Sequence, residues 1–165
     1  MAHKKPSYKY ENDWTIDEMK GLVDSLAASY IVPVNTEIKA DQTVLNFDNV
    51  KNYVLDSKKI VILDCDCRMK KKRCFAPLDV CMVFDSEADR ILNSQNSEKY
   101  INKHPHEVNA EEAMEVLEGS NKAGLVHMAY LSKDQDKVNT ICSCCSCCCE
   151  NFGAVLRYGL APHLY

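Results

Sequence analysis

The strongest constraint on this chain is a run of six cysteines within eight residues, close to its C-terminal end. The run spans residues 142–149 and reads Cys-Ser-Cys-Cys-Ser-Cys-Cys-Cys. Neighbouring cysteines there are poorly placed to pair with one another, because a disulfide needs Cα atoms about 4.4–6.8 Å apart and converging Cβ vectors. Overlapping Cys-x-x-Cys pairs (142/145, 144/147 and 145/148) instead supply closely spaced thiolates to a metal.

A second, looser set of cysteines lies upstream, and the two sets account for all ten cysteines of the chain. Cys65 and Cys67 follow an apolar stretch, so at a strand end their side chains would leave one face roughly 6–7 Å apart. We predict that the fold brings both sets together around metal. The predicted metal ligands are Cys65, Cys67, Cys74, Cys81, Cys142, Cys144, Cys145, Cys147, Cys148 and Cys149.

Composition limits the classes of protein that this chain can belong to. With 165 residues, 46% hydrophobic and 27% charged, it is typical of one globular domain. The net charge of −4 argues against a general nucleic-acid binder. No apolar stretch of about 18 residues predicts a membrane span, and no apolar segment follows Met1 as in a signal peptide. Dense cysteine without an export signal indicates a reducing cytoplasm and metal binding over disulfides.

The periodicity of apolar residues predicts a single α+β domain over residues 15–165, preceded by an N-terminal arm over 1–14. A buried central strand over 60–64 and a β-hairpin over 125–131 and 138–141 would converge the cysteines. Amphipathic helices are expected at 16–29, 49–57, 85–92, 109–123 and 150–158. Residues 30–34 read as an edge strand because of Pro33, and 93–108 as a polar loop.

Sulfur-rich tetrahedral sites indicate zinc or iron–sulfur chemistry, and the number of thiolates alone does not choose between them. The cysteine run is followed by a predicted helix that starts at Glu150. A helix N-terminus suits an anionic thiolate cluster and can donate hydrogen bonds to cluster sulfurs. This chemistry favours iron–sulfur. The alternative is non-redox: a zinc-stabilised adaptor, or a thiolate store for zinc or copper.

Five segments occur in an order that resembles a known family. They are Cys65-Asp-Cys-Arg68, Cys74-Phe-Ala-Pro-Leu-Asp-Val-Cys81, Glu111-Glu-Ala113, Ala123-Gly-Leu-Val-His127 and the run from Ile141 to Cys149. Together they are similar to 4Fe-4S ferredoxin-type proteins of anaerobic bacteria and archaea, over roughly residues 50–162. Many members also carry two C-x-x-C-x-x-C ferredoxin motifs, which these 165 residues lack.

The resemblance implies iron–sulfur redox work in an anaerobe, with electron transfer to or from a partner protein. It favours an electron carrier or redox subunit over a stand-alone enzyme, and it implies no known reaction or catalytic residue.

Two further residues are candidates for contacts with the cofactor. Arg68 begins a run to Arg73 with five positive charges in six residues. Arg68 could compensate cluster charge and the lysines could dock an acidic redox partner, or the run is a solvated loop. His127 could ligate metal or shuttle protons, although a strand histidine is more often structural. The acidic stretch 87–118 suggests self-association as a homo-oligomer and repels nucleic acid.

Overall fold

The computed structural model describes residues 10–32, 47–132 and 138–158. Its elements, in chain order, are α1 (Ile16–Ser25), β1 (Leu26–Val32), α2 (Phe47–Asp56), β2 (Ile60–Asp64), α3 (Asp66–Lys71), β3 (Asp79–Phe84), α4 (Asp85–Asn93), β4 (His106–Val108), α5 (Ala110–Lys122), β5 (Val126–Ser132), β6 (Thr140–Cys144) and α6 (Glu150–Tyr158).

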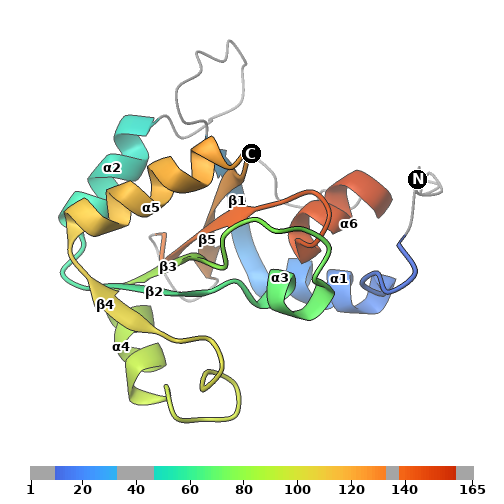
Figure 1. Ribbon diagram of the computed structural model, residues 1–165, viewed down its shortest axis with the longest axis horizontal. Coiled ribbons are helices and arrows are strands. Elements are labelled where there is room, and N and C mark those ends of the chain that lie inside the picture. The colour runs from blue at the N-terminus through green and yellow to red at the C-terminus, as the bar shows by residue number, and fades with distance from the viewer. Residues whose placement is uncertain (1–9, 33–46, 133–137, 159–165) are drawn as a thin grey trace.

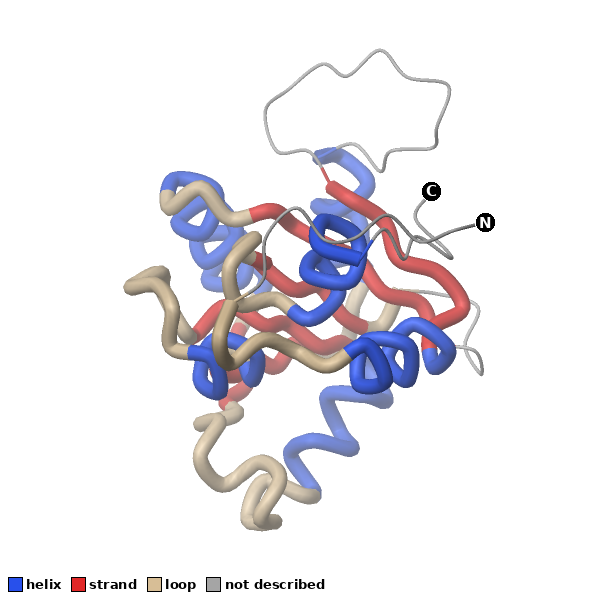
Figure 2. The backbone as a smooth tube through the Cα atoms, turned by 90° about the vertical axis from the view of Figure 1, so that its right-hand side faces the viewer, coloured by secondary structure: helices blue, strands red, loops and turns tan. Residues whose placement is uncertain are grey.

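The strands form one six-stranded sheet in the order β1-β5-β6-β3-β2-β4, and every neighbouring pair is antiparallel. Helices α2 and α5 pack together on one face, whereas α4, α1 and α6 lie on the other side (Figures 1 and 2). The predicted α+β class is therefore confirmed. No helix among the described residues is long and apolar enough to cross a membrane.

Strand β2 is buried on both faces, as its four consecutive apolar residues predict. Ile60 and Ile62 join the core beneath α2 and α5, while Val61 and Leu63 join the core beneath α4. This alternation follows from the two-residue period of a strand. The strand is held between β3 and β4, and it delivers the chain directly to Cys65.

Helix α5 begins and ends where the sequence predicts. Asn109 Oδ1 accepts a hydrogen bond from the Glu112 amide at 2.9 Å, and the Glu112 carboxylate accepts one from the Asn109 amide at 2.9 Å. This capping box satisfies amide groups that the first turn leaves unpaired. At the other end Gly124 has a φ of 73°, a backbone conformation that glycine adopts without strain.

The hairpin of β5 and β6 is also confirmed, but β6 extends into the cysteine run, so Cys142 and Cys144 are strand residues. Strand β3 was not predicted. It lies between β2 and β6, so the central strand and the hairpin converge with β3 between them. From the sequence we predicted only that Cys81 is a metal ligand here, although an apolar run such as 80–84 also favours a strand.

Two other element boundaries differ from the prediction. The helix expected over 16–29 ends at Ser25, and 26–32 form the edge strand β1, because pairing with β5 outweighs the helical periodicity. The polar segment 93–108 contains the short strand β4, which pairs with β2. Residues 33–46, which include the end of the edge strand expected over 30–34, lie outside the described residues.

The face of α5 that covers the sheet gives a test of the core. Leu117 has no exposed surface, whereas Leu55 on α2 is 55% exposed. Leu117→Ala should destabilise the chain by about 2–5 kcal/mol, because it removes packed methyl groups and leaves a cavity. Leu55→Ala is the matched control and should cost under about 0.5 kcal/mol. Urea unfolding of both variants measures the difference, and equal losses would contradict this description of the core.

Candidate metal centre

The first cysteines of the site stand at the start of a helix, not at the end of a strand. Strand β2 ends at Asp64, Cys65 is the N-cap of α3, and Cys67 lies in the first turn. The amide of Met69 donates to the Cys65 carbonyl at 3.0 Å, which begins the helix. The placement of both cysteines at a strand end is therefore wrong, but the thiols of Cys65 and Cys67 still interact.

Four thiols form a compact group that can hold a metal ion. We call Cys74, Cys145, Cys147 and Cys148 the four-thiol group, and their sulfur atoms all lie within 4.8 Å of one another. The Sγ atom of Cys74 is 3.8 Å from that of Cys145 and 4.0 Å from that of Cys148. The Sγ atoms of Cys147 and Cys148 are 3.7 Å apart. All four are free cysteines.

The other six thiols line a cleft of about 270 Å³ on the α1 and α6 side of the sheet. We call them the six-thiol group: Cys65, Cys67, Cys81, Cys142, Cys144 and Cys149. Cys81 and Cys142 face each other on neighbouring strands, with their sulfur atoms 3.7 Å apart. Further thiol contacts run from Cys81 to Cys65, on to Cys67, then to Cys149 and finally to Cys144. The contacts thus follow an almost closed ring around the cleft.

Each group mixes cysteines from the upstream set and from the run at 142–149. Along the run, Cys142, Cys144 and Cys149 belong to the six-thiol group, whereas 145, 147 and 148 belong to the four-thiol group. Upstream, only Cys74 joins the four-thiol group. The structure therefore brings the two sets together, and it divides them in a way that the linear spacing does not reveal.

Arg68 lies between the two groups as a buried positive charge. Its side chain is 2% exposed, its Nη2 donates to the Ser143 carbonyl at 2.8 Å, and its Nη1 donates to the Pro77 carbonyl. Burial alone would lower the pKa of the guanidinium, yet the thiols of Cys65 and Cys145 raise it. Arg68 was predicted to compensate charge at a cluster, and its surroundings are consistent with that role.

One thiol in each group favours the thiolate form. Hydrogen bonds with the thiols of Cys67 and Cys81, helped by the Arg68 charge, lower the pKa of Cys65 to about 3. Burial opposes ionisation of Cys145, but the Cys148 amide and the Arg68 guanidinium lower its pKa to about 7. Thiolates are the form that binds metal.

The neighbouring thiols, by contrast, resist ionisation. Cys149 and Cys65 raise the pKa of Cys67, Cys142 and Cys65 raise that of Cys81, and Cys144 raises that of Cys149. Like charges a few ångströms apart disfavour one another in a buried site. A bound cation reverses this effect, because it stabilises every thiolate around it. The donor set and its charges therefore fit a thiophilic metal.

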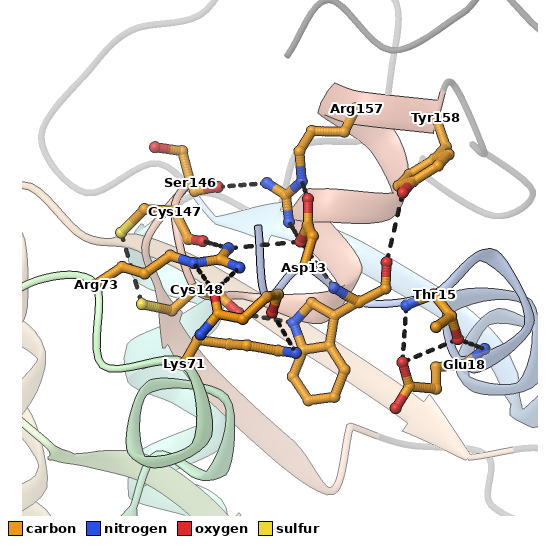
Figure 3. A network of polar contacts seen from close by, with 12 residues as sticks. Asp13, Thr15, Glu18, Lys71, Arg73, Ser146, Cys147, Cys148, Arg157 and Tyr158 are labelled. Carbon is orange, nitrogen blue, oxygen red and sulfur yellow. Dashed lines mark hydrogen bonds and ion pairs between the residues drawn. The ribbon is translucent and has the colours of Figure 1, made fainter. Parts of the chain in front are cut away.

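The cysteine loop between β6 and α6 is clamped through three successive carbonyl groups (Figure 3). The Ser146 carbonyl accepts from Arg157 Nη1 at 2.9 Å, and the Cys147 carbonyl accepts from Arg73 Nη1 at 2.7 Å. The Cys148 carbonyl accepts from the indole Nε1 of Trp14 at 2.9 Å. These donors come from α6, from the segment after α3 and from the N-terminal side of α1, so three distant segments fix the loop.

Asp13 joins two of these donors. Its carboxylate is fully shielded and lies 2.6 Å from Arg157 Nε and 3.5 Å from Arg73 Nη1. Burial would raise the pKa of Asp13, but the Trp14 amide and the Arg157 guanidinium hold it below its usual value. Removing one partner from such a buried arrangement leaves an uncompensated charge. The resulting loss of folding free energy is far larger than the net stabilisation that the pair provides. We call Asp13, Trp14, Arg73 and Arg157 the loop clamp.

One of the two interpretations of the basic run 68–73 was a solvated loop, and that interpretation is wrong. The first four residues of the run belong to α3, which ends at Lys71, and the capping residue Lys72 has a φ of 50°. Arg73 turns inward to the loop clamp, and Lys71 Nζ donates to the Asn12 carbonyl at 2.8 Å and lies 4.1 Å from the centre of the Trp14 ring. Most of the run therefore contacts its own chain.

His127 lies away from both thiol groups. It pairs with Ser143 across the β5–β6 ladder, and its Nδ1 is 3.0 Å from the Ser143 hydroxyl, beside the α5 residue Leu117. Strand alternation places Cys142 and Cys144 on the opposite face of the sheet. Burial lowers the pKa of His127 to about 4, which keeps the ring neutral. His127 therefore supports the strand that carries the cysteines.

Sequence reasoning missed the loop clamp and the polar residues of the cleft. Asp13 and Arg157 are 144 positions apart, so no local pattern connects them. Asn151 and Tyr130 line the cleft beside the thiols, and neither stands in a recognisable motif. A weak signal was available in Trp14, the only tryptophan of the chain, because a side chain of this size is highly buried on average.

Comparisons of the chain with protein-family models, with curated proteins and with solved structures gave no match.

The loop clamp can be tested at a glycine. A Cβ added at Gly153 in α6 overlaps the Arg157 guanidinium, whereas a Cβ at Gly119 in α5 meets nothing within 4 Å. Gly119→Ala should stabilise the chain by about 0.5–1 kcal/mol, as alanine does within a helix. Gly153→Ala should instead destabilise it by about 1–3 kcal/mol, because Arg157 must leave its partners.

Urea unfolding of the two variants gives the free energies, and hydrogen exchange of residues 145–149 reports on the loop. Faster exchange is expected only in Gly153→Ala. Stabilisation by both substitutions would show that Arg157 is not held as described.

Proposed function

We propose that this chain is an iron–sulfur redox protein that carries electrons to or from a partner protein. The observation that supports this most is the gathering of all ten cysteines, as free thiols, into two adjacent groups at one end of the sheet. A disulfide scaffold would pair them, and an ordinary core needs no such density. The resemblance to ferredoxin-type proteins of anaerobes points to the same chemistry.

The surroundings of the thiols suit a permanent redox site better than a metal store. Several thiols are buried, with exposed fractions of 7% or less for Cys65, Cys144, Cys148 and Cys149. The loop that carries the last two is fixed by the loop clamp, and Arg68 supplies an internal positive charge. A store that loads and releases metal needs access and mobile ligands. A redox centre needs a rigid site whose charge and solvent exposure set its potential.

The cysteines of the two groups are the residues that would hold the metal, and iron bound by thiolates would supply one-electron chemistry. The chain's own residues have separate roles. Arg68 offsets negative charge, the loop clamp prevents the ligands from spreading, and the sheet shields one side from water. Cys74, Cys145 and Cys147 are only partly buried, so this edge is where electrons could reach a partner.

The surface beside Cys74 has features that suit a docking partner. Phe75 is fully exposed, Leu78 is 41% exposed, and Lys72 lies on the same segment with its side chain in solvent. An exposed aromatic ring next to a ligand residue is the kind of anchor that protein interfaces use. We place the redox partner on this surface and the protein in the reducing cytoplasm.

A specific observation favours zinc as a second candidate at the four-thiol group. Four thiolates around one tetrahedral ion, with bonds of about 2.3 Å, lie about 3.8 Å from one another. Three of the six sulfur–sulfur separations, 3.7, 3.8 and 4.0 Å, agree with this value, and all six are at most 4.8 Å. In a four-iron cubane each thiolate binds a different iron atom, so the four thiolates must lie farther apart than they do around one ion. A single zinc ion there would stabilise the fold without redox chemistry.

Anaerobic purification after expression with ample iron tests the redox proposal. We expect brown protein that contains iron and acid-labile sulfide, and whose visible absorption bleaches with dithionite or with oxygen. A colourless protein that holds zinc alone, under the same conditions, would contradict the proposal and support the zinc-stabilised adaptor.

A further inference from the structure

The cleft lined by the six-thiol group offers more ligands than one metal ion uses. A tetrahedral ion such as zinc or ferrous iron takes four thiolates. The sulfur contacts run from Cys142 through Cys81, Cys65, Cys67 and Cys149 to Cys144. These contacts link all six thiols, so no four of them form a set that is separate from the remaining two. The thiols thus form one continuous donor surface.

Simple packing does not account for this arrangement. Buried free cysteines behave as small apolar side chains and fill space, whereas these six surround about 270 Å³ of open space. The two larger apolar cores lie beneath α2 with α5 and beneath α4. Smaller apolar clusters around Val80 with Leu125, and around Met128, back the six thiols on the side away from the cleft. A cleft walled by sulfur is what a polymetallic core would occupy.

Polar groups that could serve such a core also line the cleft. Asn151 is 4% exposed, and its amide Nδ2 makes no hydrogen bond of standard geometry, although it lies beside the Tyr130 hydroxyl. The Tyr130 hydroxyl is 4.0 Å from the Cys144 sulfur. Buried donors without partners are rare, because each costs about 1–3 kcal/mol. Both groups can donate to thiolate or sulfide once the cleft is filled.

The four-thiol group is separate from this cleft. It has its own set of four ligands, Cys74, Cys145, Cys147 and Cys148, whose sulfur atoms lie within 4.8 Å of one another, close enough to surround one tetrahedral ion. None of these four lines the cleft. Between the groups lies Arg68, whose guanidinium interacts with Cys65 of one group and with Cys145 of the other. This charge allows two anionic centres to lie close together.

We infer that the ten thiols build two centres of different nuclearity: a single-ion site in the four-thiol group and a polynuclear metal–thiolate centre in the six-thiol cleft. The identity of the cleft's metal as iron, with inorganic sulfide, rests on the proposed function. The division into two centres rests on the positions of the sulfur atoms alone.

Group-selective variants of the full chain test this inference. Cys74→Ser with Cys147→Ser removes half of the four-thiol group, and Cys81→Ser with Cys142→Ser removes the facing pair of the six-thiol group. The exposed Ser146→Ala is the control, since it lies in the same loop without a thiol. Each protein is reconstituted anaerobically with ferrous iron and sulfide, and separately with Zn²⁺ alone. Native mass spectrometry then counts the metal ions per chain.

The unaltered chain and the Ser146→Ala control should each carry one metal ion more than the variant with Cys74→Ser and Cys147→Ser. The second variant should lose two or more ions and retain one. Cys67→Ser with Cys149→Ser should give the same loss as Cys81→Ser with Cys142→Ser. Because Cys67 and Cys149 lie outside the strands, this variant shows that the loss does not come from a disrupted sheet. Circular dichroism of each loaded variant shows whether it has folded.

If both kinds of variant lose the same fraction of their metal ions, the inference is overturned, because all ten thiols would then serve one shared centre. So would a single metal ion per unaltered chain in both reconstitutions. If the counts hold with Zn²⁺ but no iron or sulfide is retained, the two centres stand and the redox proposal fails. The experiment therefore separates the two claims.

Discussion

The candidate site depends on how charge is balanced among closely packed thiols, which would have to ionise together to bind metal. Within the cleft the thiols raise one another's pKa, as at Cys67, Cys81 and Cys149. Arg68 is a fixed positive charge in contact with both groups. One guanidinium cannot offset so many thiolates, so without metal most of the thiols stay protonated. A bound metal ion would supply the positive charge that they need in order to ionise together. Because an unfolded chain has no such site, metal-binding free energy becomes folding free energy.

The fold positions the sulfur atoms by two means. The register of the sheet sets Cys81 opposite Cys142, and the alternation along β6 turns Cys142 and Cys144 to one face while His127 and Ser143 occupy the other. The loop that follows has no ladder to hold it. Its carbonyl groups are fixed by Trp14, Arg73 and Arg157 instead. Rigid supports of this kind keep ligands in place before the metal arrives.

Much of the fold could be predicted from local patterns. The apolar run of β2, the capping box at Asn109 and the hairpin of β5 and β6 carry signals within a few residues of one another. Strand β3 also carries a local signal in its apolar run 80–84, but its position between β2 and β6 and the division of the thiols could not be predicted in the same way. Both depend on which strand pairs with which, and one shift in register would turn Cys81 or Cys142 to the other face.

The candidate site shows the same contrast. The convergence of the upstream cysteines with the run at 142–149 followed from two elements that lead into cysteines. The loop clamp did not, because its partners Asp13 and Arg157 meet only in the folded chain. The family resemblance predicted an iron–sulfur chemistry, and it gave no arrangement of ligands. Sequence therefore predicted which residues could bind metal, while the division of the thiols into two groups required the tertiary structure.

X-ray absorption at the metal edge tests the central claim most directly, since it reports the atoms around each bound metal. The account predicts a first shell of sulfur alone at about 2.3 Å, together with a metal–metal distance that disappears in the Cys81→Ser, Cys142→Ser variant. Nitrogen or oxygen ligands in place of sulfur, or the absence of any metal–metal distance in the unaltered protein, would contradict it.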